Sequence, residues 1–193
     1  WAECSNIALD PSNSSLFYTQ SLKSDRSLIL RKMRWIPNGD ADLQTGWGEN
    51  GELTYQSSMD YPVSSGPVSD GNNYLFFTDA DYTGKESNSK VIYVDVNTAK
   101  ITRTLDLSEW WVSAEDAQRE GQMTGGPIHL AYRNGWLHAS SLSSCINQMI
   151  DPYVESDADI TVWVNRNGDY VGDHNFDLSA RNPWVCNDYN TGP

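Results

Sequence analysis

Three times along this chain an Asp-Leu pair is followed by a tryptophan, in segments 42–47, 106–110 and 177–184. The aspartates of these segments are 64 and 71 residues apart. A step of one small residue, Gly and Pro recurs with them and ends at Pro67, Pro127 and Pro193, at spacings of 60 and 66 residues. Two markers with similar spacing indicate an internal structural repeat, which restricts the fold to architectures built from equivalent stacked units.

Inside the second and third units, β-branched and aromatic runs alternate with turn sequences. The expected strands of the second unit are 67–69, 74–78, 90–96 and 101–107, and those of the third are 128–132, 136–140, 159–164 and 170–178. Turns such as Asn134-Gly135 supply the positive φ angles that tight hairpins require. Each unit therefore predicts a four-stranded antiparallel meander, and the fold class is all-β.

The first unit follows the same order less closely. Segments 7–9, 16–19 and 27–36 match its first three strands, but few β-forming residues follow before Leu43. We therefore expect residues 46–55 to form an elaborated connection rather than a strand. The unit boundaries predicted from the markers are 1–47, 48–110 and 111–184, with a further unit starting at 185–193, all within one segment of a single domain.

A repeated four-stranded meander is the unit of a β-propeller, in which the units pack face to face as blades around an axis. A β-sandwich or jelly roll is the alternative all-β architecture, and the paired repeat markers favour the propeller. Because a propeller needs at least about four blades to close, three units predict an incomplete ring. We expect the remainder of the propeller, or another chain, to complete it.

The segment Tyr93-Val94-Asp95-Val96-Asn97-Thr98-Ala99-Lys100 resembles the strand-turn signature of the quinoprotein-like and YVTN-like propellers. In those families the turn usually reads Asp-x-x-Thr-Gly-Lys, and here Ala99 stands at the Gly position. The third unit has Asn165-Arg166-Asn167-Gly168 at the corresponding turn. The resemblance covers most of the second and third units, and it implies the propeller superfold.

The formal net charge of −13, from 26 acidic and 13 basic residues, limits the possible partners. Such a surface repels phosphate backbones, so nucleic acid is excluded as an expected partner. No run approaches the roughly 20 apolar residues of a membrane span. The acidic balance suits a saline or calcium-containing medium, and we expect an extracellular, periplasmic or cell-surface location.

The three cysteines show no C-x-x-C spacing of the kind that binds metal or supports redox chemistry. In an oxidising compartment one pair can form and one thiol is left over. We predict a disulfide between Cys145 and Cys186, with Cys4 free or bonded outside this chain.

The recurring tryptophans Trp47, Trp110 and Trp184 are expected to fill the wedges between units, because they recur with the repeat. An aromatic platform for a sugar or a cation is the alternative role. Trp111 does not follow the repeat, so we take it as a candidate ligand-binding ring.

Two further groups are candidates for chemistry. Asp79 and Asp81 alternate carboxylates in an acidic loop, which predicts a Ca²⁺ site, the one cofactor that the sequence suggests. His129 lies near the start of an innermost strand, where propellers bind ligands at the central channel. It is a candidate ligand-binding residue and a candidate general base.

Two functions follow from this pattern. The first is a secreted or cell-surface propeller module with a structural or interaction role, which binds a protein or a glycan through its loops. The alternative is part of an extracellular propeller enzyme, either a quinoprotein-like oxidoreductase or a polysaccharide-active enzyme. The first is preferred, because propellers bind through loops at the two ends of the axis and this chain spends its extra length on such loops.

Overall fold

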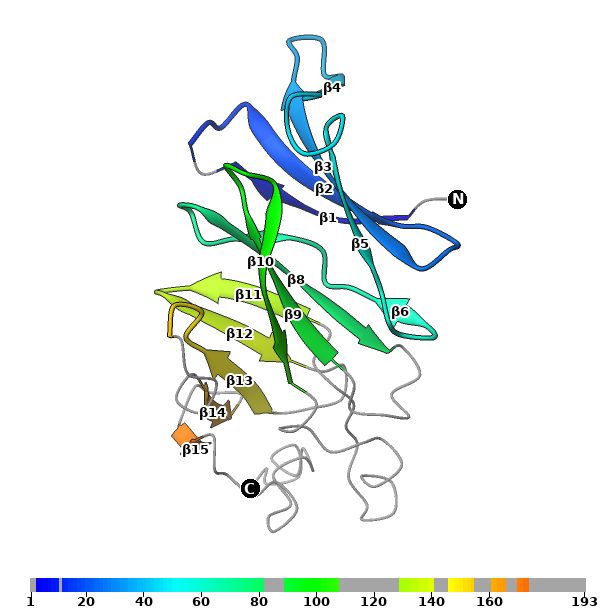
Figure 1. Cartoon of the computed structure of the whole chain (residues 1–193). Helices are drawn as coiled ribbons and strands as arrows, with labels where there is room; N and C mark the ends of the chain where they lie inside the picture. The colour runs from blue at the N-terminus through cyan, green and yellow to red at the C-terminus, as the bar shows by residue number, and fades with distance from the viewer. Residues whose placement is uncertain are drawn as a thin grey trace, which may run out of the picture.

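The computed structural model describes residues 3–10, 12–81, 89–107, 129–140, 146–154, 161–165 and 170–173. All the regular elements in these ranges are β-strands, and their pairing is antiparallel throughout (Figure 1). The all-β class predicted from the sequence is confirmed. None of these residues belongs to a helix with the length and apolar character needed to cross a membrane.

Sheet A is formed by strands between residues 3 and 56, so it includes one strand from beyond the predicted end of the first unit at residue 47. Its strands follow one another in space as they do in the chain, except that β4 and β5 share one neighbour. The C-terminal half of β3 pairs with β4, and its N-terminal half pairs with β5. The strands are β1 (Glu3–Leu9), β2 (Leu16–Leu22), β3 (Ser27–Trp35), β4 (Ala41–Leu43) and β5 (Glu52–Gln56).

Strand β5 corrects the expectation for residues 46–55. This stretch was predicted to be a connection because it is polar and rich in Gly. Its second half pairs with β3, and Leu53 and Tyr55 pack against the core. The strand signal is the alternation of these two apolar residues with the polar residues Glu52 and Thr54. The signal is weak, because only two apolar residues take part in it.

Sheet B occupies the middle of the described structure. Strand β8 pairs with β9, β9 pairs with β10, and two short strands pair with opposite ends of β8 on its other side. The strands are β6 (Pro62–Val63), β7 (Val68–Ser69), β8 (Tyr74–Asp81), β9 (Ser89–Asp95) and β10 (Lys100–Asp106). The near-continuous apolar sequences of β8 and β9 fit a sheet that is covered on both faces.

Sheet C is a simple meander in which each strand pairs with the next. The turn between its first two strands contains Asn134 and Gly135, both with positive φ, as the sequence predicted. The strands are β11 (His129–Arg133), β12 (Trp136–Ser140), β13 (Ile146–Ile150), β14 (Thr161–Asn165) and β15 (Tyr170–Asp173).

The three sheets stack face to face, with sheet B between the other two (Figure 1). Alternate residues of β8 point to opposite neighbours: Leu75 and Phe77 join the core shared with sheet A, and Phe76 joins the core shared with sheet C. Strand β7 contacts both β1 and β11, so the first strands of the three units lie close to one another. This open stack is compatible with consecutive blades of an incomplete propeller.

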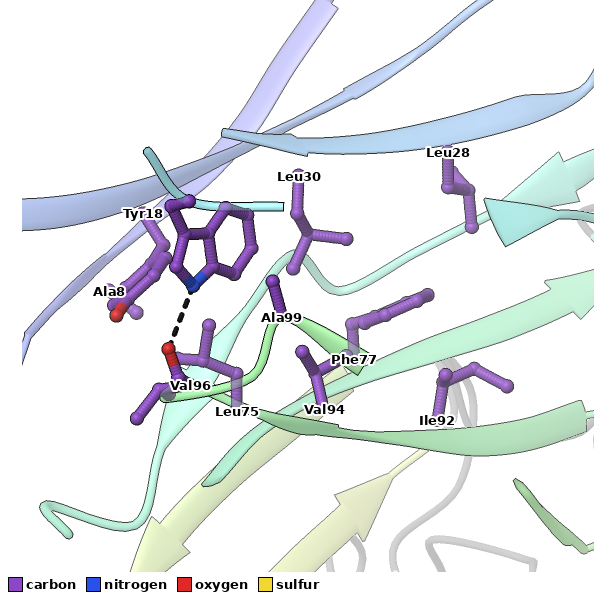
Figure 2. Close-up of a cluster of buried hydrophobic side chains, with 11 residues drawn as sticks. Ala8, Tyr18, Leu28, Leu30, Leu75, Phe77, Ile92, Val94, Val96 and Ala99 are labelled. Carbon is purple, nitrogen blue, oxygen red and sulfur yellow. Dashed lines mark hydrogen bonds between the residues drawn. The ribbon is translucent and has the colours of Figure 1, made fainter. Parts of the chain in front are cut away.

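Trp47 occupies the wedge between sheets A and B. Its side chain is buried and lies edge-on to Tyr18. Its indole N–H donates to the Val96 carbonyl at 2.8 Å, which is the dashed line in Figure 2. The packing role predicted for the repeated tryptophans is confirmed for Trp47, while Trp110 and Trp184 lie outside the described residues.

Candidate functional site

Three first-to-second-strand turns gather at one end of the stack, on the left of Figure 1: those of β1–β2, β7–β8 and β11–β12. Two of them are closed by the same bonds. The Asp10 amide donates to the Leu16 carbonyl, and the Asp70 amide donates to the Tyr74 carbonyl. Each aspartate also accepts a backbone N–H two residues on, which is the Asx-turn that short polar side chains favour.

The Trp47 loop, residues 44–51, places its tryptophan between sheets A and B at this end. Its backbone is tied internally: the Trp47 amide donates to the Gln44 carbonyl, and the Gly51 amide donates to the Trp47 carbonyl. Gly48 has φ +60°, and a Cβ at this position would lie 2.2 Å from the Glu52 carbonyl oxygen. The loop therefore needs Gly at this point, and together with the buried Trp47 it forms a fixed wall.

Two clefts border this loop. The larger has a volume of about 820 Å³ and lies between the loop and β5 on one side and the β9–β10 turn on the other. Its polar lining side chains are mostly exposed and carry carboxylate, amide, hydroxyl and ammonium groups. They are Glu49, Asn50, Glu52, Thr54, Asn97, Thr98 and Lys100.

The smaller cleft, about 580 Å³, lies on the other side of the loop and shares Gly46, Trp47 and Asn97 with the larger one. Lys32 and Arg34 line it, two of the three basic residues that stand close together at positions 31, 32 and 34. Arg34 is exposed, faces Asp42 in register, and has no ion-pair partner within the described ranges.

Lys32 is held by a buried carboxylate. Its Nζ lies 2.9 Å from Asp10 Oδ2, which also accepts a hydrogen bond from the Tyr18 hydroxyl at 2.6 Å. Burial alone would raise the pKa of Asp10, but hydrogen bonds from Ser12, Tyr18 and Lys32 outweigh it and hold this pKa well below its usual value. Burial and the same carboxylate raise the pKa of Tyr18. The network fixes the base of the smaller cleft.

A second polar cluster lies at the same end, between sheets B and C. The hydroxyls of Tyr132 and Tyr153 are 2.9 Å apart, and the Tyr153 hydroxyl donates to Asp70 Oδ2 at 2.9 Å. Tyr132 also stacks on Phe76, so its ring joins the core while its hydroxyl reaches solvent. The cluster ties the two sheets together at the surface.

Asp79, predicted as a calcium ligand, is buried between sheets A and B. Its Oδ1 accepts a hydrogen bond from Ser57 Oγ at 2.6 Å, and its Oδ2 accepts one from the Tyr55 hydroxyl at 3.1 Å. Burial raises the pKa of this carboxyl; the Ser57 and Tyr55 hydrogen bonds and the charge of Lys90 only partly oppose the rise. Both oxygens are thus used to join β8 to the end of β5.

This arrangement does not favour calcium at Asp79, because hydroxyl hydrogens occupy the positions that a cation would need. Asp81 is two residues further along β8 and partly exposed. In the part of the chain that the structure describes, no three His, Cys, Asp or Glu side chains gather as a metal site would require. Residues 82–88, next to Asp81, lie outside the described ranges, so the calcium site stays a prediction.

The remaining predicted site residues are not brought together. His129 is exposed at the start of β11, opposite Ser140 in register, and it stays a candidate ligand residue and a candidate general base. Trp111, Cys145 and Cys186 lie outside the described residues, so the ligand role of the first and the disulfide of the other two stay predictions. The clefts beside the Trp47 loop were missed, because their lining comes from segments about 50 residues apart in the chain.

No protein-family model matches the chain, and no curated protein matches it.

Proposed function

We propose that this chain supplies consecutive blades of a β-propeller and works as an interaction module, secreted or at the cell surface. The stacked antiparallel sheets and the converging first strands support the propeller assignment. The acidic composition supports the location. The observation that carries the interaction role is the face of sheet A that points away from sheet B.

This outer face of sheet A is apolar, and no other sheet in the described part of the chain packs against it. Phe17 is buried on this face, where the Trp35 ring stacks on it, and Ile29 is buried as well. Ile7, Leu9 and Trp35 are 56%, 59% and 44% exposed. Register places Leu9, Phe17, Met33 and Leu43 in one row across the four strands β1 to β4. Large apolar groups gathered on one surface in this way mark an interaction site.

In the other two sheets the equivalent positions pack against a neighbouring sheet. The closing bonds of the β1–β2 and β7–β8 turns make Leu16 equivalent to Tyr74, and therefore Phe17 equivalent to Leu75. Leu75 is buried against sheet A, and the corresponding Leu137 of sheet C is buried against sheet B. In both of these sheets the preceding sheet covers this face, so the partner that fits sheet A is a further antiparallel blade.

Such a blade would come from the remainder of the ring or from another chain. The ring would then present the clefts beside the Trp47 loop at one end of the sheets. Their mixed carboxylate, amide, hydroxyl and ammonium lining suits a polar ligand, either a glycan or a protein segment. Loops at the ends of the sheets are where propellers bind their partners.

Sedimentation velocity on the protein isolated from its source tests this proposal. Because closure needs at least about four blades, we expect a particle heavier than the 21.6 kDa of this chain. Leu9→Lys places a charge on the outer face of sheet A, which the further blade would cover. This substitution should release the chain from the particle or lower the unfolding temperature of the particle. Tyr61→Lys, at an exposed position in the connection from β5 to β6, should do neither.

A particle of 21.6 kDa would contradict ring completion. So would a Leu9→Lys protein that keeps the mass and the unfolding temperature of the unmodified protein.

A further inference from the structure

Strand β5 lies beside the N-terminal half of β3 and is the outer strand of sheet A there. In the described part of the chain β5 pairs only with β3. The bonds that flank the pairing show which groups face β3: Lys32 N–H donates to the Gly51 carbonyl, and Ser57 N–H donates to the Arg26 carbonyl. Hydrogen-bonding residues alternate along an antiparallel strand. The backbone groups of Leu53 and Tyr55 therefore face β3, and those of Glu52, Thr54 and Gln56 face outward.

The chain itself begins to pair with this outer edge. Glu49 forms an isolated antiparallel bridge with Glu52, in which each amide donates to the other's carbonyl, at 2.8 and 3.2 Å. The bridge uses the outward groups of Glu52 and then stops. The outward N–H and C=O of Thr54 and Gln56 continue the same row with no partner among the described residues.

The space beside this row is the larger cleft. Glu52, Leu53 and Thr54 line it on the β5 side, and the β9–β10 turn lines it on the other. Ile101 of β10 pairs in register with Val94, so its side chain shares the face of sheet B that looks toward sheet A. It is 37% exposed and directly follows Lys100, which lines the cleft.

The outer strand of sheet B, unlike β5, has an edge that is protected from further pairing. Strand β10 carries Lys100, Arg103 and Asp106, charged side chains of the kind that protect sheet edges from pairing. The Arg103 guanidinium also binds the Val154 carbonyl at 2.7 Å, which ties β10 to the neighbouring sheet. The centre of β5, Leu53 to Tyr55, has neither a charged residue nor a proline.

We propose that the outer edge of β5 binds an extended peptide segment by β-strand addition. The peptide main chain pairs with Thr54 and Gln56, and alternate apolar side chains enter the cleft toward Ile101. Basic residues at the other positions suit Glu49 and the acidic surface of the chain. The inference deepens the proposed interaction role, but it uses a surface separate from the outer face of sheet A.

The test measures binding of a fluorescent peptide of alternating lysine and valine, about seven residues long, by anisotropy. The control peptide has the same sequence with N-methyl groups on alternate amides, so it keeps its charge and side chains but cannot pair. We expect the unmodified peptide to bind at least about tenfold more tightly, the effect of losing about 1.4 kcal/mol of hydrogen bonding.

The matched protein variants are Thr54→Pro and Thr54→Ala. Proline removes the outward N–H of residue 54 and leaves the ladder with β3 intact, a placement that edge strands tolerate. Alanine keeps the N–H. We expect Thr54→Pro to lose at least about tenfold in affinity and Thr54→Ala to bind like the unmodified protein, with matching urea midpoints for the two variants.

A measurement on the unmodified protein tests the proposal even if a variant fails to fold. Amide hydrogen exchange at Thr54 and Gln56 should slow when the alternating peptide is added. The proposal is overturned if these amides are not protected, or if the N-methylated peptide binds equally well. Equal binding by a folded Thr54→Pro protein would overturn it too. None of these outcomes depends on ring completion.

Discussion

At the scale of single residues, Asp79 shows how a surface-like sequence feature becomes part of the core. The Asp-Ala-Asp sequence looks like a pair of solvated loop acids or a cation site. In the structure the first carboxylate is buried, and its two partners come from 22 and 24 residues earlier in the chain. Buried carboxylates need such partners, because an unpaired charge in the core is costly.

Asp79 should make stability fall as the pH rises. Its pKa is raised in the folded state, so the folded protein holds this proton more tightly than the unfolded chain. The stability that this proton contributes to the folded state is fully present below the ordinary carboxyl pKa of 3.8. It is lost as the pH rises through the raised pKa of Asp79. Asp79→Asn removes this proton. Its free energy of unfolding, relative to that of the unmodified protein, should therefore increase from about pH 4 to about pH 8.

Urea unfolding across this pH range measures the difference. Asp42→Asn is the control, because it makes the same substitution at an exposed carboxylate on β4. A constant difference between Asp79→Asn and the unmodified protein at all pH values would contradict a raised pKa for Asp79.

At the scale of elements, the Trp47 loop decides the geometry between sheets A and B. Gly48 is its tightest position, since an added Cβ would meet the Glu52 carbonyl oxygen at 2.2 Å. Gly71 also has positive φ, but an added Cβ there would meet nothing within 4 Å. The two glycines therefore separate the cost of a left-handed backbone from the cost of a clash.

Gly71→Ala should lose about 1 kcal/mol of unfolding free energy, the cost of positive φ for a side-chain-bearing residue. Gly48→Ala should lose at least about 2 kcal/mol more, because the loop must move away from Glu52. Urea unfolding of both variants checks the difference. Equal losses would show that the loop moves without cost and would contradict its role as a fixed wall.

The elements themselves were predictable to different degrees. Strands β8, β9 and β12 were predicted from β-branched and aromatic runs between turn residues, and the structure confirms them. Strand β5 was not, because its half-buried alternation covers only Leu53 and Tyr55 and follows a Gly-rich loop. The clefts were not predictable either, since they depend on how the Trp47 loop meets the β9–β10 turn across two sheets.

At the scale of the whole molecule, the repeat markers predicted the all-β class and an unclosed set of antiparallel sheets, and the structure shows both. Each sheet has five strands where four were predicted, and in sheet C the additional strand is β13, which was not among the expected strands. The role of Trp47 was also predictable, because its place in the repeat puts it between two units. The apolar outer face of sheet A was not predicted. Ile7, Leu9 and Trp35 look like core residues in the sequence, and only the strand register shows that they share one uncovered face.

The central claim is that this face is covered by a further blade in the working protein. The direct test is the rate at which a thiol reagent labels Leu9→Cys in the protein isolated in its native assembly, with the modified site identified by peptide mass. Tyr61→Cys, at an exposed position in the connection from β5 to β6, gives the reference rate. We predict that Leu9→Cys reacts at least about tenfold more slowly than Tyr61→Cys, because labelling must wait for the blade to open. Equal rates at the two positions would contradict the claim.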